Sequence, residues 1–142
     1  MSDSNGSLPH RIQVLIVDEH AAVRGALSTF LTAFDDLVLA GQAANGEEAI
    51  RLCAYTHPDI VLLDVTLPDM TGAAATRAIL ERCPASRIVA TCTFQEEELI
   101  PGVLSAGATG HLLKNISADE LASVIRATYG TASPDTHTHS LA

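Results

Sequence analysis

Five short apolar segments recur along the chain, and each is followed by a segment with helical spacing. The apolar segments have the length of strands, and several are rich in β-branched residues. Between them, apolar residues recur three and four positions apart, as in residues 21–34, which is typical of a helix with one buried face. Strands that are apolar throughout are covered on both faces. The alternation therefore predicts an α/β domain, (βα)5, with a doubly wound, five-stranded parallel sheet.

The expected elements can be placed by residue. The strands are residues 12–17, 37–43, 60–64, 87–92 and 110–113, and the regular helices are residues 21–34, 45–56, 71–82 and 117–130. The remaining helix, between residues 96 and 106, contains Pro101-Gly102 in its middle. Interior proline costs ~3 kcal/mol and glycine about 1 relative to alanine. We therefore predict a helix that is short and starts near Pro101, or that is kinked there, with residues 94–100 as a mobile loop.

Length, charge and cysteine usage limit the class of protein. The 142 residues fit one domain, expected over residues 11–130, with a disordered segment over 1–10 and a tail or interdomain linker over 131–142. The net charge of −9 argues against direct nucleic-acid binding by this chain. Because no apolar run suggests a signal peptide or a membrane span, we expect a cytoplasmic protein without a membrane partner. The three cysteines indicate neither disulfides nor a zinc site.

Charged side chains follow several of the expected strands at the point where each strand ends. Asp18-Glu19 follows the first strand, Asp64 ends the third, Thr91-Cys92-Thr93 lies at the end of the fourth, and Lys114 follows the fifth. The carboxyl ends of parallel strands share one edge of the sheet, where α/β proteins bind ligands. Clustered carboxylates repel one another unless a cation is present, and few hard oxygen ligands suit Mg²⁺. A metal, a carboxylate and an ammonium together indicate phosphoryl transfer.

Three segments of the sequence carry a resemblance to a known family. They are residues 17–20 (VDEH), residues 61–72 (VLLDVTLPDMTG) and residues 106–115 (AGATGHLLKN). Together they resemble the CheY-like receiver domain of response regulators, of the NarL type, which implies a flavodoxin-like fold. The segment after Asp64 has the family's proline four residues later and its glycine eight residues later.

The resemblance implies a role for each matching residue. Asp64 would accept a phosphoryl group from a sensor histidine kinase, and Lys114 would pair with the phosphoryl oxygens. Mg²⁺ would be bound by Asp18, Glu19, Asp64 and the backbone carbonyl of Thr66. Such a protein phosphorylates and dephosphorylates itself and is not a conventional enzyme. Its switch would act at the face formed by the fourth helix, fifth strand and fifth helix, with a weak homodimer expected on phosphorylation.

Three residues depart from the family pattern. Glu19 stands where aspartate is the commoner residue, and Cys92 stands where the family usually has Thr or Ser. His111 occupies the position of the family's switch aromatic. We expect Cys92 to weaken the switch, since a thiol is a weak hydrogen-bond donor. The alternative is that Cys92 is a small buried hydrophobic residue.

Other functions remain open at this point. NarL-type regulators carry a DNA-binding domain after the receiver, and these 142 residues do not include one. The chain is therefore either a fragment of a longer transcription regulator or a stand-alone receiver. A phosphate-independent protein-interaction module is the alternative function. A small Mg²⁺-dependent phosphatase is disfavoured because Thr66 stands where it would place a second aspartate, and no P-loop motif occurs.

Overall fold

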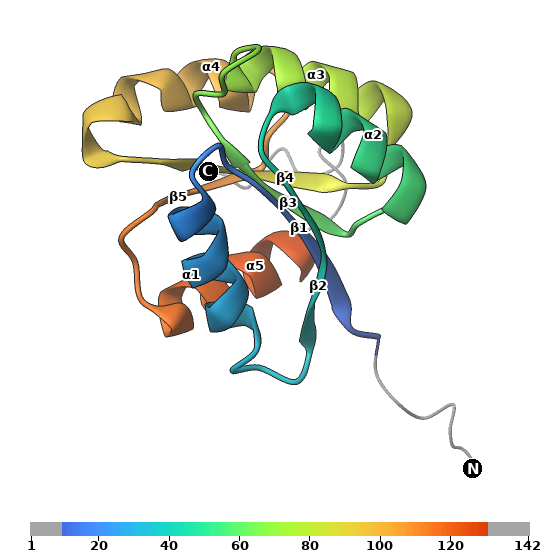
Figure 1. Cartoon of the computed structure of the whole chain (residues 1–142), viewed down its shortest axis with the longest axis vertical. Coiled ribbons are helices and arrows are strands. Elements are labelled where there is room, and N and C mark those ends of the chain that lie inside the picture. Colours follow the sequence, from blue (N-terminus) through green and yellow to red (C-terminus); the bar gives the residue numbers. More distant parts are fainter. Residues whose placement is uncertain (1–9, 131–142) are drawn as a thin grey trace.

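The computed structural model describes residues 10–130 as one α/β domain with a central parallel sheet (Figure 1). The sheet order is β2-β1-β3-β4-β5, which is the flavodoxin-like order. The strands are β1 (Ile12–Val17), β2 (Leu37–Ala43), β3 (Ile60–Asp64), β4 (Arg87–Cys92) and β5 (Gly110–Leu113). The helices are α1 (Ala21–Leu31), α2 (Gly46–Thr56), α3 (Gly72–Arg82), α4 (Ile100–Ser105) and α5 (Ala118–Gly130). The predicted fold class and all five strands are confirmed.

Helices cover both faces of the sheet, so each face has its own apolar core. One core joins β-strand residues to α2, α3 and α4, through residues such as Ala49, Ile79 and Val103. The other joins them to α1 and α5, through residues such as Leu27 and Ile125. Figure 1 shows α1 and α5 on one side of the sheet and α2, α3 and α4 on the other. The central strands are buried on both sides, which explains why their sequences are apolar throughout.

Side-chain caps fix where several helices begin. Asn45 accepts a hydrogen bond from the backbone N–H of Glu48 at the start of α2, and Thr71 caps α3 through the N–H of Ala74. Before α5, Ser117 and Glu120 form a reciprocal capping box. These caps place the loops at the carboxyl edge of the sheet, where the candidate site lies.

The region around α4 is partly as predicted. The α-helix is short, and Pro101 lies in its first turn, where proline is tolerated. The prediction that residues 94–100 form a loop is wrong, because a 3₁₀ helix, η1 (Phe94–Leu99), fills this segment and runs directly into α4. A capping box between Thr93 and Glu96 starts η1 and satisfies its first backbone donors. Proline thus sets the start of α4 without leaving the preceding residues irregular.

Predictions for residues 1–9 and 131–142 fall outside the described part of the chain. At its boundary, His10 pairs with Asp59 at 2.9 Å and its ring stacks on Tyr129. Within residues 10–130, no helix is long and apolar enough to cross a membrane.

Candidate functional site

Three charged side chains meet at the carboxyl edge of the sheet. Asp64 is the last residue of β3, Asp18 follows the neighbouring strand β1, and Lys114 follows β5. The Lys114 ammonium lies 2.8 Å from Asp18 Oδ2 and 2.9 Å from Asp64 Oδ2. Both carboxylates are almost fully buried, with side-chain exposures of 1% and 3%. The sequence therefore predicted correctly that these three residues come together.

The backbone holds Lys114 and Asp64 in place. The N–H of Lys114 donates to the carbonyl of Cys92, which continues the β4–β5 pairing by one residue. Asp64 Oδ1 accepts a hydrogen bond of 3.1 Å from the N–H of Thr66. One oxygen of Asp64 thus faces the loop that follows β3, and the other faces Lys114.

Burial and charge act in opposite directions at this site. Burial raises the pKa of Asp64 above its usual value, although Lys114 and the N–H of Thr66 both favour the ionised form. Burial would by itself lower the pKa of Lys114, but the two carboxylates outweigh it and raise that pKa. The ammonium therefore stays protonated, while the ionised form of Asp64 is less stable here than it would be in water.

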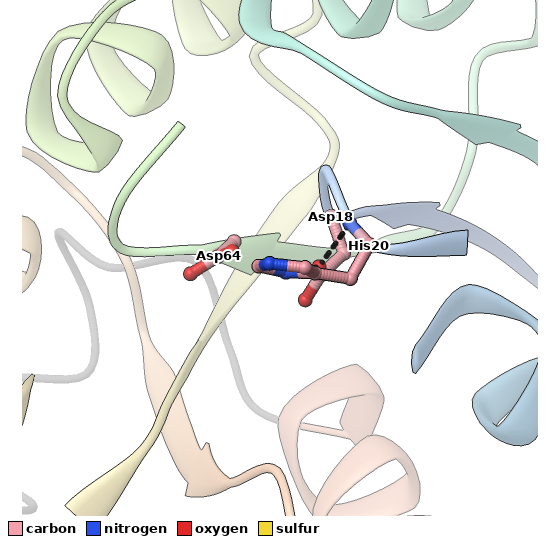
Figure 2. A group of neighbouring side chains, drawn as sticks. All are labelled: Asp18, His20 and Asp64. Carbon is pink, nitrogen blue, oxygen red and sulfur yellow. Dashed lines mark hydrogen bonds and ion pairs between the residues drawn. The ribbon is translucent and has the colours of Figure 1, made fainter. Parts of the chain in front are cut away.

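A third residue, His20, lies beside the two carboxylates (Figure 2). The backbone N–H of His20 donates to Asp18 Oδ1 at 2.8 Å, and its ring Nδ1 is 3.2 Å from the same oxygen. Asp18, His20 and Asp64 each offer a ligand atom, and these atoms lie within 4.8 Å of one another. Glu19, predicted as a metal ligand, is exposed and lies outside this group. The metal-binding role of Glu19 remains a prediction. His20 belongs to the VDEH segment but was not predicted to lie at the site.

The donor set fits a divalent cation. Asp18 Oδ2 is buried, makes no hydrogen bond and meets Lys114 only as an ion pair. Carboxylate oxygens are the ligands that hard cations such as Mg²⁺ prefer. The positive charge of Lys114 occupies the position between the two carboxylates, so a cation that binds both of them competes with this ammonium. The cluster is thus a candidate Mg²⁺ site, as receiver domains generally have at their acidic pocket.

The loop after β3 is tightly built. Thr66 pairs with Thr71 in an isolated bridge, and the N–H of Gly72 donates to the carbonyl of Val65. A Cβ at Gly72 would lie 2.7 Å from Val65 Cα and 2.8 Å from its carbonyl oxygen. Only glycine fits this close approach of two backbone segments, which accounts for the glycine eight residues after Asp64.

Asp69, in the same loop, binds the start of α2. Its carboxylate accepts hydrogen bonds from the N–H groups of Gly46 and Glu47, at 2.8 and 3.0 Å. These bonds lower the pKa of Asp69 below its usual value. This contact was not predicted from the sequence. The sequence signal was the start of α2 itself, because the first backbone N–H groups of a helix have no partner within the helix and favour an acidic side chain.

Cys92 and His111 lie in different surroundings. Cys92 is buried and belongs to the same apolar cluster as Ile100 and Val103, and burial raises the pKa of its thiol. His111 is an exposed residue of β5. Thr91 is buried and lies opposite Asp64 in the pairing of β3 with β4. The switch roles of Cys92 and His111 remain predictions.

Comparisons with known proteins agree with this geometry. Residues 14–126 match the family described as the response regulator receiver domain. The transcriptional regulatory protein LiaR of Bacillus subtilis (strain 168) is 36% identical over 116 residues, which cover 82% of this chain and 55% of LiaR. Response regulator protein VraR of Staphylococcus epidermidis is 34% identical over 118 residues, 83% of this chain and 56% of VraR. The chain thus spans about half the length of these curated relatives.

A solved structure agrees in fold and sequence. The crystal structure of a two-component response regulator of the LuxR family from Aurantimonas sp. SI85-9A1 superposes with a TM-score of 0.78 at 32% identity. The match covers 88% of this chain and 91% of that chain. The family match, the sheet order and the carboxylate–lysine cluster lead to the same conclusion. This chain belongs to the response regulator receiver domain family, whose general function is to accept a phosphoryl group in two-component signalling.

Proposed function

We propose that Asp64 is the phosphoacceptor of this receiver domain. The observation that carries the proposal is the position of Lys114, whose ammonium contacts both buried carboxylates at the end of β3 and β1. An Asp64 oxygen attacks the phosphorus of a phosphohistidine on a sensor histidine kinase. The P–N bond breaks as the O–P bond forms, and the imidazole leaves. The product is an acyl phosphate on Asp64 and a free histidine on the kinase.

The residues of this chain then neutralise the added charge. Lys114 is already held at the site by its backbone bond to Cys92, and its ammonium turns from the carboxylates to the phosphoryl oxygens. Asp18, Glu19, Asp64 and the backbone carbonyl of Thr66 would hold Mg²⁺. When bound, the ion supplies positive charge to the transferring phosphoryl group. Positioning and charge neutralisation provide most of the catalysis in such transfers. The domain modifies itself and is not a conventional enzyme.

Movement of Lys114 links the site to the opposite end of β5. Lys114 follows directly after β5, and His111 lies on the same short strand, so a shift of the ammonium is transmitted along it. We infer a two-state change at the face of α4, β5 and α5, with Cys92 and His111 as switch residues. Phosphorylation would favour a weak homodimer through this region.

The output lies beyond these residues. Because the matched residues cover only about half of the curated relatives, and because LiaR is a transcriptional regulatory protein by name, we propose a cytoplasmic regulator with a DNA-binding output domain. Cys92 supports the second candidate, a phosphate-independent interaction module, because the thiol packs in an apolar cluster.

Beryllofluoride, a phosphoryl mimic, tests the proposal. The parent and Asp64→Asn are compared by amide NMR with beryllofluoride and Mg²⁺. Shifts at residues 111–115 of the parent that are missing in Asp64→Asn support the phosphate switch. Parent spectra that do not change would favour the interaction module.

A further inference from the structure

The backbone of His20 begins α1 and places the residue at the metal cluster, while its side chain takes no part in the helix. It precedes the first residue of α1, and its side chain makes no capping hydrogen bond there. Its N–H bond to Asp18 Oδ1 instead fixes the residue beside the buried carboxylate. The ring is 65% exposed, so it turns without disturbing the core. A ring nitrogen therefore stands at the open side of a site whose two carboxylates are buried.

We propose that His20 supplies a nitrogen ligand to the divalent cation bound by Asp18 and Asp64. The site is then not an all-oxygen site, and His20 adjusts which metals it takes. Imidazole suits first-row ions such as Co²⁺ and Zn²⁺, whereas Mg²⁺ prefers oxygen and keeps several waters. The proposal rests on the metal site of the proposed function and adds a residue that sets its selectivity.

Three observations support His20 as a metal ligand and not merely as a residue that happens to lie nearby. The ligand atoms of Asp18, His20 and Asp64 already lie within 4.8 Å of one another without any ion. Asp18 Oδ2 is buried and makes no hydrogen bond besides its ion pair with Lys114 at 2.8 Å, so it can bind a cation once the ammonium moves away. In the view of Figure 2 the His20 ring lies beside Asp18 and projects toward Asp64.

Lys114 opposes any cation at this position. Its ammonium contacts Asp18 and Asp64 and has to give way when a metal binds both carboxylates. The His20 nitrogen is a further ligand besides the two carboxylates that Lys114 contacts. For ions that bind imidazole, it therefore offsets part of the competition from the ammonium. Mg²⁺ gains little from the same ring, so His20 should raise the affinity for ions such as Co²⁺ and leave that for Mg²⁺ unchanged.

The test compares Co²⁺ and Mg²⁺ affinities of the full chain by calorimetry, for the parent, His20→Ala and Asp18→Asn. Residues that merely orient a ligand change metal affinity by roughly 10- to 100-fold, so losing a direct ligand should weaken Co²⁺ by at least about tenfold. His20→Ala should leave Mg²⁺ affinity unchanged. Asp18→Asn should weaken both metals.

The controls separate the ring from other histidines. His57→Asn removes an exposed histidine at the end of α2, where φ is 50° and asparagine is tolerated. All proteins also carry His137→Ala and His139→Ala, because two histidines this close to each other in the sequence can bind Co²⁺ independently of the site. His57→Asn should change neither affinity.

The outcomes distinguish this inference from the proposed function. Equal Co²⁺ affinity in the parent and His20→Ala, or equal weakening of both metals, overturns the nitrogen ligand and leaves the Mg²⁺ site standing. Unchanged Mg²⁺ affinity in Asp18→Asn overturns both. As a direct readout, Zn²⁺ should shift one ring ¹⁵N resonance of His20 in the parent, and an unshifted ring contradicts ligation.

Discussion

Replacing Lys114 by methionine removes the ammonium between two buried carboxylates while keeping most of the side-chain volume. Lys114 Nζ lies 2.8 Å from Asp18 and 2.9 Å from Asp64. At an effective dielectric of about 20, each contact has a gross attraction of about 6 kcal/mol. Most of this attraction offsets the desolvation of the three groups, and removing one partner of a buried pair costs ~3–5 kcal/mol.

We expect a loss near the lower end of that range. The Lys114 side chain is 12% exposed at the edge of the sheet, so water screens part of the repulsion left between Asp18 and Asp64. The free energy of unfolding should therefore fall by ~3 kcal/mol at neutral pH without metal. Divalent metal should restore much of this loss, because it supplies the missing positive charge.

The loss should depend on pH in a defined direction. Burial already raises the pKa of Asp64, and removing Lys114 raises it further. A carboxyl with a raised pKa in the folded state contributes stability that is present below its unfolded pKa and is lost as the pH rises through the folded value. Lys114→Met should therefore be close to the parent near the unfolded value of 3.8 and furthest from it at neutral pH.

Urea unfolding at acidic and neutral pH, with and without Mg²⁺, measures these differences. The matched control is Arg126→Met, which breaks the exposed ion pair with Asp36, where both side chains are at least 40% exposed. The control should lose much less, because water and salt screen exposed pairs. A Lys114→Met protein as stable as the parent at neutral pH without metal would refute the reasoning.

Four other substitutions test the surrounding structure. Gly72→Ala should lower the free energy of unfolding by ~1–3 kcal/mol through its backbone clash, whereas Gly25→Ala, which has nothing within 4 Å of its Cβ, should raise it by about 0.5–1; equal effects in urea unfolding would contradict this. Asp69→Ala should cost about 1 kcal/mol at neutral pH. Because the pKa of Asp69 is lowered in the folded state, the difference in unfolding free energy should fade below pH 3.8. A difference that persists in acid would show that the ionised carboxylate does not stabilise the start of α2. Cys92→Thr should enlarge the beryllofluoride-induced NMR shifts of residues 111–115, and identical shifts in both proteins rule out a weakened switch.

Strands and long-range contacts differ in how much of them the sequence predicts. The strand β3 was predictable because a short apolar run bounded by turn residues is typical of a buried strand in a compact domain. The meeting of Asp64 with Lys114 followed from parallel strands sharing one edge. Pro101 correctly predicted a short α4, but the Thr93–Glu96 capping box that turns residues 94–99 into η1 was missed.

The missed site contacts have a common physical cause. Beyond the end of a strand the alternation of side chains no longer holds, so sequence position does not decide whether Glu19 or His20 faces Asp64. The contact of Asp69 with the start of α2 joins residues more than 20 positions apart. It depends on two loops lying side by side at the carboxyl edge, which periodicity does not report.

The most direct test of the account is chemical mapping of the phosphorylated residue. The parent and Asp64→Asn are incubated with acetyl phosphate and Mg²⁺, and the acyl phosphate is then reduced with borohydride, which converts a phosphorylated aspartate to homoserine. Peptide mass spectrometry locates the change. The account predicts homoserine at position 64 of the parent, only when Mg²⁺ is present, and none in Asp64→Asn. Homoserine at another aspartate, or equal phosphorylation of both proteins, would contradict it.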